Sequence, residues 1–262
     1  MQDGSKEPKV FMTINVNLAG IVPFSTIDLR DKTAIVFFLA GCPFRCIYCQ
    51  NYEYLDYKNL VDVDEIKSMI DRAEEFVDGV VFSGGEPTLQ PIPLFDLLKY
   101  CKRKGLYTGI QTNGYMYDVV NKCLSYLDLI SMDVKAPLNK EIYSTICGID
   151  EKAAESAIES IKKILNDERL FLRLEVKTTI YKEFVGLLSD IKKDIPEGID
   201  WIIQKGYVEK IPPQQTRMSA SRERFDIVTE LKEDDIKKLA EDLAGDRKNI
   251  WIRTELGDKK IS

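Results

Sequence analysis

Three cysteines lie close together in the segment Cys42-Pro-Phe-Arg-Cys46-Ile-Tyr-Cys49. Thiolates are soft ligands that suit zinc or iron–sulfur centres. A structural zinc site takes four ligands, but this chain has no histidine and no fourth cysteine near the segment. Three thiolates instead leave one position of a metal centre open, as chemistry at a metal requires. The other cysteines are isolated in or beside helical patterns, where packing is the expected role: Cys101, Cys123 and Cys147.

The amino-acid composition excludes several classes of protein and of active site. The absence of histidine excludes His general bases, Ser-His and Cys-His nucleophile pairs, and His-ligated metals. A net charge of −6 argues against a general nucleic-acid coat. The N-terminal segment lacks the apolar run of a signal peptide, and the longest apolar run, Ala34 to Ala40, is too short to span a bilayer. We therefore expect a cytoplasmic protein in a reducing setting, with neither a membrane nor nucleic acid as partner.

Short apolar strand patterns alternate with amphipathic helix patterns along the chain. Strands are expected at 34–39, 79–82, 107–111, 129–133, 170–179 and 201–204, and helices at 64–76, 94–104, 117–126, 153–166 and 184–191. This alternation implies parallel strands with helices outside. It favours an α/β fold in a single domain, 1–262, with a partial (β/α)6 TIM-like barrel over about 20–205. A short C-terminal extension, about 206–262, would hold a long loop at 207–225, a helix at 233–243 and a strand at 249–254.

Polar and glycine-rich motifs follow the ends of these strands. The cysteine segment follows the first, and Ser83-Gly84-Gly85-Glu86-Pro87 follows the second. Gln111-Thr112-Asn113-Gly114 and Asp133-Val134-Lys135 follow the third and fourth. Ligands of parallel α/β folds bind at the carboxyl ends of the strands, so the motifs are expected to form one site.

The residue types suggest roles and leave alternatives open. The glycines would let the backbone approach a ligand, and Glu86 and the adjoining carbonyls could accept hydrogen bonds from an ammonium group. A tight turn would explain the same residues. Alternation puts Asp133 and Lys135 on one face, where two charges are costly unless they are paired or used. A plain surface ion pair is the alternative for these two.

The spacing Cys-x3-Cys-x2-Cys, with Tyr48 before the last cysteine, resembles the signature of the radical S-adenosylmethionine (SAM) superfamily. The Gly84-Gly85-Glu86 motif on the next strand strengthens that resemblance. It implies that the three cysteines hold three irons of a [4Fe–4S] cluster, and that the fourth iron chelates the amino and carboxylate groups of SAM. One-electron reduction would cleave SAM to methionine and a 5′-deoxyadenosyl radical, which abstracts hydrogen from a substrate.

The same resemblance implies a set of cofactor contacts. Arg173 stands in the predicted strand 170–179 and resembles the superfamily's basic residue that contacts the SAM carboxylate. A structural pair with Glu175 is the alternative for Arg173. The implied cofactor-binding residues are Tyr48, Gly84, Gly85, Glu86, Thr112, Asn113, Asp133, Lys135 and Arg173.

Within the superfamily, the chain resembles the glycyl-radical-enzyme activases, above all those of anaerobic ribonucleotide reductase. The resemblance lies in Pro23-Phe-Ser-Thr-Ile-Asp28, in Gln50-Asn51 after the third cysteine, and in Met132-Asp-Val-Lys135. It implies a glycyl radical enzyme as partner, a one-electron donor such as flavodoxin or ferredoxin, and contact of Asp28 with the partner's glycine loop. Four departures from the family pattern concern the substrate. Leu29-Arg30-Asp31 stands where the family often has Pro-Gly, Gln50 and Gln204 replace histidines, and Gln111 replaces an aspartate.

Two other functions fit the same residues. The first is a radical SAM enzyme that acts on a small molecule or a modified nucleotide. The second is a metal-binding interaction module in which the cysteines are structural. The locally basic loop 207–225 is a candidate for partner contact, with plain disorder as the alternative.

Overall fold

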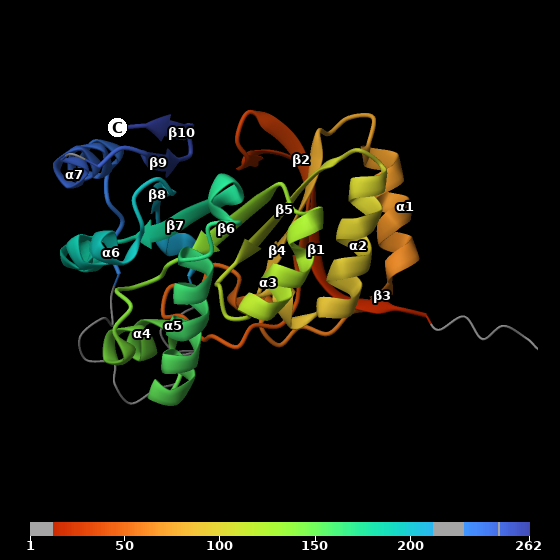
Figure 1. Cartoon of the computed structure of the whole chain (residues 1–262), viewed down its shortest axis with the longest axis horizontal. Helices are drawn as coiled ribbons and strands as arrows, with labels where there is room; N and C mark the ends of the chain where they lie inside the picture. Colours follow the sequence, from red (N-terminus) through yellow and green to blue (C-terminus); the bar gives the residue numbers. More distant parts are fainter. Residues whose placement is uncertain (1–12, 212–227, 246) are drawn as a thin grey trace, which may run out of the picture.

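The computed structural model describes residues 13–211, 228–245 and 247–262. In these residues one curved sheet has the strand order β10-β9-β8-β7-β6-β5-β4-β2-β1-β3 (Figure 1). The strands are β1 Asn15–Leu29, β2 Lys32–Leu39, β3 Leu60–Asp62, β4 Gly79–Gly84, β5 Tyr107–Thr112, β6 Leu129–Asp133, β7 Leu174–Ile180, β8 Asp200–Lys205, β9 Ile250–Thr254 and β10 Gly257–Lys260. Neighbouring strands from β2 through β9 pair in parallel, whereas β1, β3 and β10 join by antiparallel pairing.

Helices follow the strands and cover the sheet. They are α1 Val63–Ala73, α2 Pro91–Arg103, α3 Tyr117–Cys123, α4 Lys140–Cys147, α5 Glu151–Leu165, α6 Leu188–Asp194 and α7 Glu233–Ala244. Figure 1 shows α1 and α2 near one end of the sheet and α6 and α7 near the other. In α5 the buried Ala157, Ile161 and Leu165 recur at helical spacing, so one face packs inward. No helix in the described ranges is both long enough and apolar enough to cross a bilayer.

The predicted α/β partial barrel is confirmed, and the strand at Leu129–Asp133 has the expected bounds. Four elements lie outside the predicted pattern: β1, β3, α4 and β10. The segment upstream of the predicted first strand is itself a strand, β1, which pairs antiparallel with β2. It lacks a regular apolar alternation and contains the exposed Pro23, which suits an edge strand.

The C-terminal extension is part of the sheet. Strand β9 pairs in parallel with β8, where Trp201 lies opposite Ile250, and β10 folds back on β9. The predicted loop is described only in its first residues, where Val208–Lys210 forms a 3-10 turn. Residues 212–225 of that loop lie outside the described residues. The structure therefore brings the C-terminal strands to the barrel wall.

Arg30, in the turn between β1 and β2, bridges the two ends of the sheet. Its guanidinium pairs with Asp200 at 2.7 Å, Glu175 at 3.3 Å and Asp258 at 3.6 Å. It also lies over the ring of Trp251, 3.9 Å from the ring centroid. These contacts join β1 to β7, β8, β9 and β10, although β1 shares no ladder with any of these four strands in the described residues.

Candidate active site at the carboxyl ends of the strands

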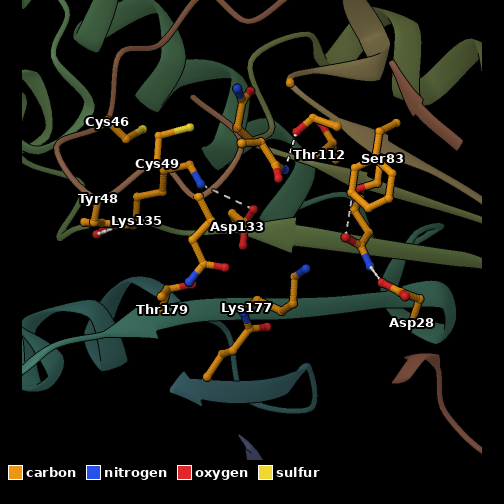
Figure 2. Close-up of a pocket in the computed structure, with 18 of the residues that line it drawn as sticks. Asp28, Cys46, Tyr48, Cys49, Ser83, Thr112, Asp133, Lys135, Lys177 and Thr179 are labelled. Carbon is orange, nitrogen blue, oxygen red and sulfur yellow. Dashed lines mark hydrogen bonds and ion pairs between the residues drawn. The ribbon is translucent and has the colours of Figure 1, made fainter. Parts of the chain in front are cut away.

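A pocket of about 550 Å³ opens at the carboxyl ends of the parallel strands. It gathers most of the residues that the sequence suggested. Those lining it are Asp28, Cys42, Cys46, Tyr48, Cys49, Gly84, Gly85, Gln111, Thr112, Asn113, Asp133, Lys135 and Gln204. Glu86 and Arg173 are not among the lining residues. Figure 2 shows Cys46 and Cys49 on one side of the pocket and Asp28 on the other.

The cysteine loop is fixed by helix α4. The amide of Arg45 donates to the carbonyl of Cys147 at 2.8 Å, and the amide of Ile47 donates to Ile146 at 3.1 Å. Gly148, which ends α4 in a left-handed conformation, allows this approach, because a Cβ there would lie 2.2 Å from the Arg45 carbonyl oxygen. The loop that carries Cys46 therefore depends on a helix that the sequence pattern did not indicate.

The thiols have an environment that suits metal binding. Cys42 Sγ accepts from the amide of Phe44 at 3.4 Å and from Asn113 Nδ2 at 3.6 Å. Burial, with the nearby charge of Cys46, raises the pKa of Cys49 to about 11, so a bound cation is needed to stabilise its thiolate. Among the described residues, no three His, Cys, Asp or Glu side chains converge on a single ion. Thiolates are the ligands of iron–sulfur clusters, so the chemistry of three cysteines on one loop suits such a cluster.

The two glycines of the second motif are required by the neighbouring backbone. The amide of Gly85 donates to the carbonyl of Leu39 at 2.8 Å. A Cβ at Gly84 would lie 2.4 Å from the backbone of Leu39, and one at Gly85 would lie 2.0 Å from the Gly41 oxygen. A ligand was expected to approach these glycines closely. In the structure, the backbone at the end of β2 and in the cysteine loop makes this close approach.

Gly85→Ala is expected to displace the cysteine loop, because a Cβ cannot lie 2.0 Å from a carbonyl oxygen. The variant should lose most of its iron after anaerobic reconstitution, together with a lower melting temperature. Gly186→Ala is the matched control, since a Cβ there meets nothing within 4 Å. Iron content equal to that of the wild type in the Gly85 variant would contradict this reading of the motif.

Glu86 has a different role from the one expected. Its buried carboxylate accepts from the amide of Thr88 at 3.0 Å, from Thr112 Oγ1 at 2.8 Å and from the amide of Asn113 at 2.7 Å. Burial raises its pKa, while these donors act in the opposite direction. Because its oxygens face the protein rather than the pocket, Glu86 is a positioning residue that ties the second motif to the third.

Asp133 and Lys135 form an ion pair inside the pocket. Lys135 Nζ lies 3.3 Å from Asp133 Oδ2, and the backbone carbonyl of Lys135 accepts from the Tyr48 hydroxyl at 3.2 Å (Figure 2). Burial acts to raise the pKa of Asp133, but the charges of Lys135 and Lys177 lower it overall. The pair lines the pocket and is largely buried, so it is not a plain surface ion pair.

A chain of hydrogen bonds crosses from β4 to β1. Ser83 Oγ donates to Gln111 Oε1 at 2.9 Å, and Gln111 Nε2 donates to Asp28 Oδ1 at 2.7 Å (Figure 2). Ser25 Oγ donates to Asp28 Oδ2 at 2.5 Å. The amide of Gln111 therefore serves to hold the Asp28 carboxylate, a bond that an aspartate at this position could not donate.

The expectation for Arg173 is wrong in location. Residues Phe171–Arg173 form a 3-10 turn, and β7 begins only at Leu174, so Arg173 lies at the amino end of the strand. Its Nη1 donates to the carbonyl of Leu124 at 2.6 Å. The alternative pair with Glu175 is not formed either, because Glu175 accepts from Ser131 Oγ and pairs with Arg30.

Lys177 is the basic residue of β7 that lines the pocket. It is only 6% exposed, and within the described ranges its ammonium has no hydrogen-bond or ion-pair partner. The available signal was a lysine in the middle of the strand Leu-Glu-Val-Lys-Thr-Thr-Ile, because a parallel strand is buried on both faces and a buried charge needs a use. Other residues that line the pocket were not indicated by any sequence pattern: Thr179, Tyr207, Arg253, Thr254 and Glu255.

Comparisons with known proteins agree with this geometry. The model of the radical SAM superfamily matches residues 36–170. A candidate glycyl-radical enzyme activating enzyme of Methanocaldococcus jannaschii is 30% identical over 93% of this chain and 98% of its own. The pyruvate formate-lyase-activating enzyme of Clostridium pasteurianum is 32% identical over 67% of this chain and 72% of its own.

Solved structures show the same fold at lower identity. The structure of TYW1 with a lysine-pyruvate adduct bound has a TM-score of 0.55 and 20% identity, covering 86% of this chain and 77% of the other. The likeness concerns the barrel alone. The cysteine loop, the pocket and the two relatives together lead to one conclusion: the chain belongs to the radical SAM superfamily and is a radical SAM enzyme of the activating-enzyme type.

Proposed function

We propose that this chain installs a glycyl radical on a partner enzyme by reductive cleavage of SAM. The observation that carries the proposal is the placement of Asp28 across one pocket from Cys46 and Cys49 (Figure 2), with Cys42 lining the same pocket. The names of its relatives as activating enzymes support it. We extend the proposal to a partner of the anaerobic ribonucleotide reductase type and to flavodoxin or ferredoxin as electron donor.

The superfamily implies SAM and an iron–sulfur cluster, generally [4Fe–4S]. In the proposal Cys42, Cys46 and Cys49 hold the cluster, which when bound supplies the electron that cleaves SAM to methionine and a 5′-deoxyadenosyl radical. The amide donors at Cys42 Sγ, from Phe44 and Asn113, would stabilise the negative charge on that sulfur.

Charged side chains in the pocket suit the carboxylate of the amino acid part of SAM. The ammonium of Lys177 is unpartnered in the described residues and fits a carboxylate. Lys135 stands beside Asp133 and would add a second cation to that end. Tyr48 closes the wall behind them, since its ring packs 5.5 Å from those of Tyr181 and Phe184. This aromatic wall would exclude water and stray hydrogen donors from the reacting radical.

Deuterium transfer tests the proposal directly. The chain is reconstituted anaerobically with iron and sulfide, reduced with dithionite, and mixed with SAM and an anaerobic ribonucleotide reductase labelled with α-deuterated glycine. We expect 5′-deoxyadenosine that carries deuterium, together with a glycyl radical signal in electron paramagnetic resonance. Unlabelled 5′-deoxyadenosine without a glycyl signal, seen with every glycyl radical enzyme tried, would overturn the proposal and favour a small molecule as substrate.

A further inference from the structure

Two charged residues face the pocket from strands that lie far apart in the sheet order. Asp28 stands near the end of β1, and Arg253 stands on β9. Both line the pocket, and Arg253 is only 7% exposed. In the described residues β9 pairs with β8 and β10 and not with β1, so the two side chains flank the place where the barrel is not closed by a ladder.

Arg253 has one side of its guanidinium fixed and one side free. Its Nε donates to Asp258 Oδ1 at 2.6 Å, and its Nη2 donates to Asp258 Oδ2 at 2.7 Å. Glu175 lies 3.7 Å from the same Nη2. Within the described part of the chain, Nη1 has no acceptor. A guanidinium N–H in a nearly buried site needs an acceptor, so a ligand that offers one is favoured there.

Asp28 retains capacity to accept. Each of its carboxylate oxygens receives one hydrogen bond, from Gln111 and from Ser25, and each oxygen can accept another. These two donors also fix the orientation of the carboxylate. The pocket thus presents a positioned acceptor on β1 and a positioned donor on β9.

The carboxylate of Asp258 contacts arginines on both sides of this opening, one on β9 and one next to β1. Asp258 holds the fork of Arg253 and also lies 3.6 Å from Arg30, two residues after Asp28. Burial acts to lower the pKa of Arg253, but the hydrogen bond with Asp258 and the charges of Glu175, Asp258 and Asp28 raise it overall. The guanidinium therefore stays charged and interacts with Asp28 across the pocket.

We propose that Asp28 and Arg253 together hold the backbone of the target glycine, with Asp28 accepting from the glycine N–H and Arg253 Nη1 donating to the glycine C=O. The inference rests on the proposed function and adds Arg253 as a residue that selects and orients the partner. One acceptor and one donor match the N–H and C=O of one backbone residue, whereas a simple anion would need donors alone. A glycine suits this approach because no side chain separates its backbone from the two groups.

The surface around the opening favours a polypeptide over a free amino acid. Phe24 and Ile27 on β1 are each 54% exposed, and Leu256 on the opposite flank is 87% exposed. Strand β3 pairs only with Asn15–Asn17, so the outer edge of β1 beyond them is unpaired in the described residues. An extended segment could add to that edge and cover the apolar side chains, which a free amino acid could not do.

The test uses a blocked pentapeptide, N-acetyl-Ser-Ala-Gly-Ala-Ser-amide with α-deuterated glycine, and the cluster-loaded enzyme with SAM. Peptide affinity is measured by calorimetry and deuterium transfer by mass spectrometry. Arg253→Met should weaken peptide binding by roughly tenfold or more, as expected for the loss of a charged hydrogen bond. Arg247→Met is the matched control, because Arg247 is a buried arginine whose guanidinium donates to Ile195 and Pro196 rather than to the pocket.

Modified peptides separate recognition from a loss of structure. Sarcosine in place of glycine removes the N–H that Asp28 is proposed to bind. Asp28→Asn should therefore weaken binding of the glycine peptide but not of the sarcosine peptide, whereas Arg253→Met should weaken binding of both. A thioamide in place of the glycine carbonyl weakens the acceptor, so it should reduce the effect of Arg253→Met alone. Equal effects of Arg253→Met on all three peptides would mean that Arg253 only supports the fold, and would overturn the inference.

Three further outcomes are distinguishable. If free amino acids displace the peptide and donate deuterium themselves, Asp28 and Arg253 recognise a zwitterion and the inference is wrong. If the unmodified enzyme takes deuterium from no glycine peptide and from no glycyl radical enzyme, the proposed function fails. If the unmodified enzyme is active and Arg253→Met binds the peptide as well as Arg247→Met does, the role given to Arg253 is wrong and the proposed function stands.

Discussion

Cys46→Ala is expected to abolish cluster binding and all cleavage of SAM. Cys46 lines the pocket between Cys42 and Cys49, on a loop whose backbone is held by helix α4 through Cys147 and Ile146. With one thiolate missing, the two remaining cysteines offer too few ligands for three irons, and no histidine exists to replace the third. Iron and sulfide content after anaerobic reconstitution, and 5′-deoxyadenosine formed on reduction, measure the two losses.

Cys101→Ala is the control for this prediction. Cys101 is fully buried in α2 and does not line the pocket, so its replacement should lower the melting temperature and leave the iron content unchanged. If Cys46→Ala kept its full cluster content, the assignment of the three cysteines as ligands would be refuted. Equal loss of iron in both variants would instead indicate a general failure to fold.

Local patterns were sufficient to predict the barrel and most of the pocket. Runs such as Ala-Ile-Val-Phe-Phe-Leu in β2 are buried on both faces, which is typical of a parallel strand. Parallel pairing then aligns the carboxyl ends of neighbouring strands, so residues far apart in sequence, such as Cys42 and Lys135, meet in one pocket. Their meeting follows from topology, and topology follows from the alternation of strands and helices.

The features that could not be predicted depend on long-range pairing. Strand β1 has no regular apolar alternation, and its place is set by its ladder with β2 and by the contacts of Arg30 with Glu175 and Asp200. Arg253 reaches the pocket only because β9 extends the sheet beyond β8. No local pattern in the sequence reports which strand a C-terminal segment joins.

The orientation of single side chains was a second source of error. Glu86 was expected to face a ligand, but the donors that it meets, Thr112 and Asn113, come from the next strand end. A buried carboxylate with that many protein donors gains more from them than from a mobile ligand. The position of the motif was therefore predicted correctly. The hydrogen-bond partners of Glu86 come from the neighbouring strand end, which the motif itself does not indicate.

Lys177→Met is expected to weaken SAM binding by roughly 10- to 100-fold, the range for a charged hydrogen bond in a buried site. Lys177 is nearly buried and unpartnered in the described residues, and methionine preserves its length and apolar stem. The Lys177 ammonium also helps to lower the pKa of Asp133. Lys135, whose charge contributes more to that shift, remains beside Asp133 in the variant. Equilibrium binding of SAM to the cluster-loaded, unreduced enzyme measures the affinity without turnover.

Arg173→Met decides between the two basic residues of this region. Its guanidinium donates to the Leu124 carbonyl at the amino end of β7, away from the pocket, so the variant should lose stability and keep its affinity for SAM. The opposite pattern, with weaker binding in Arg173→Met and normal binding in Lys177→Met, would restore Arg173 as the carboxylate contact. Because both residues are cations only four positions apart on one segment, a difference between the variants reflects their placement and not the net charge of the enzyme.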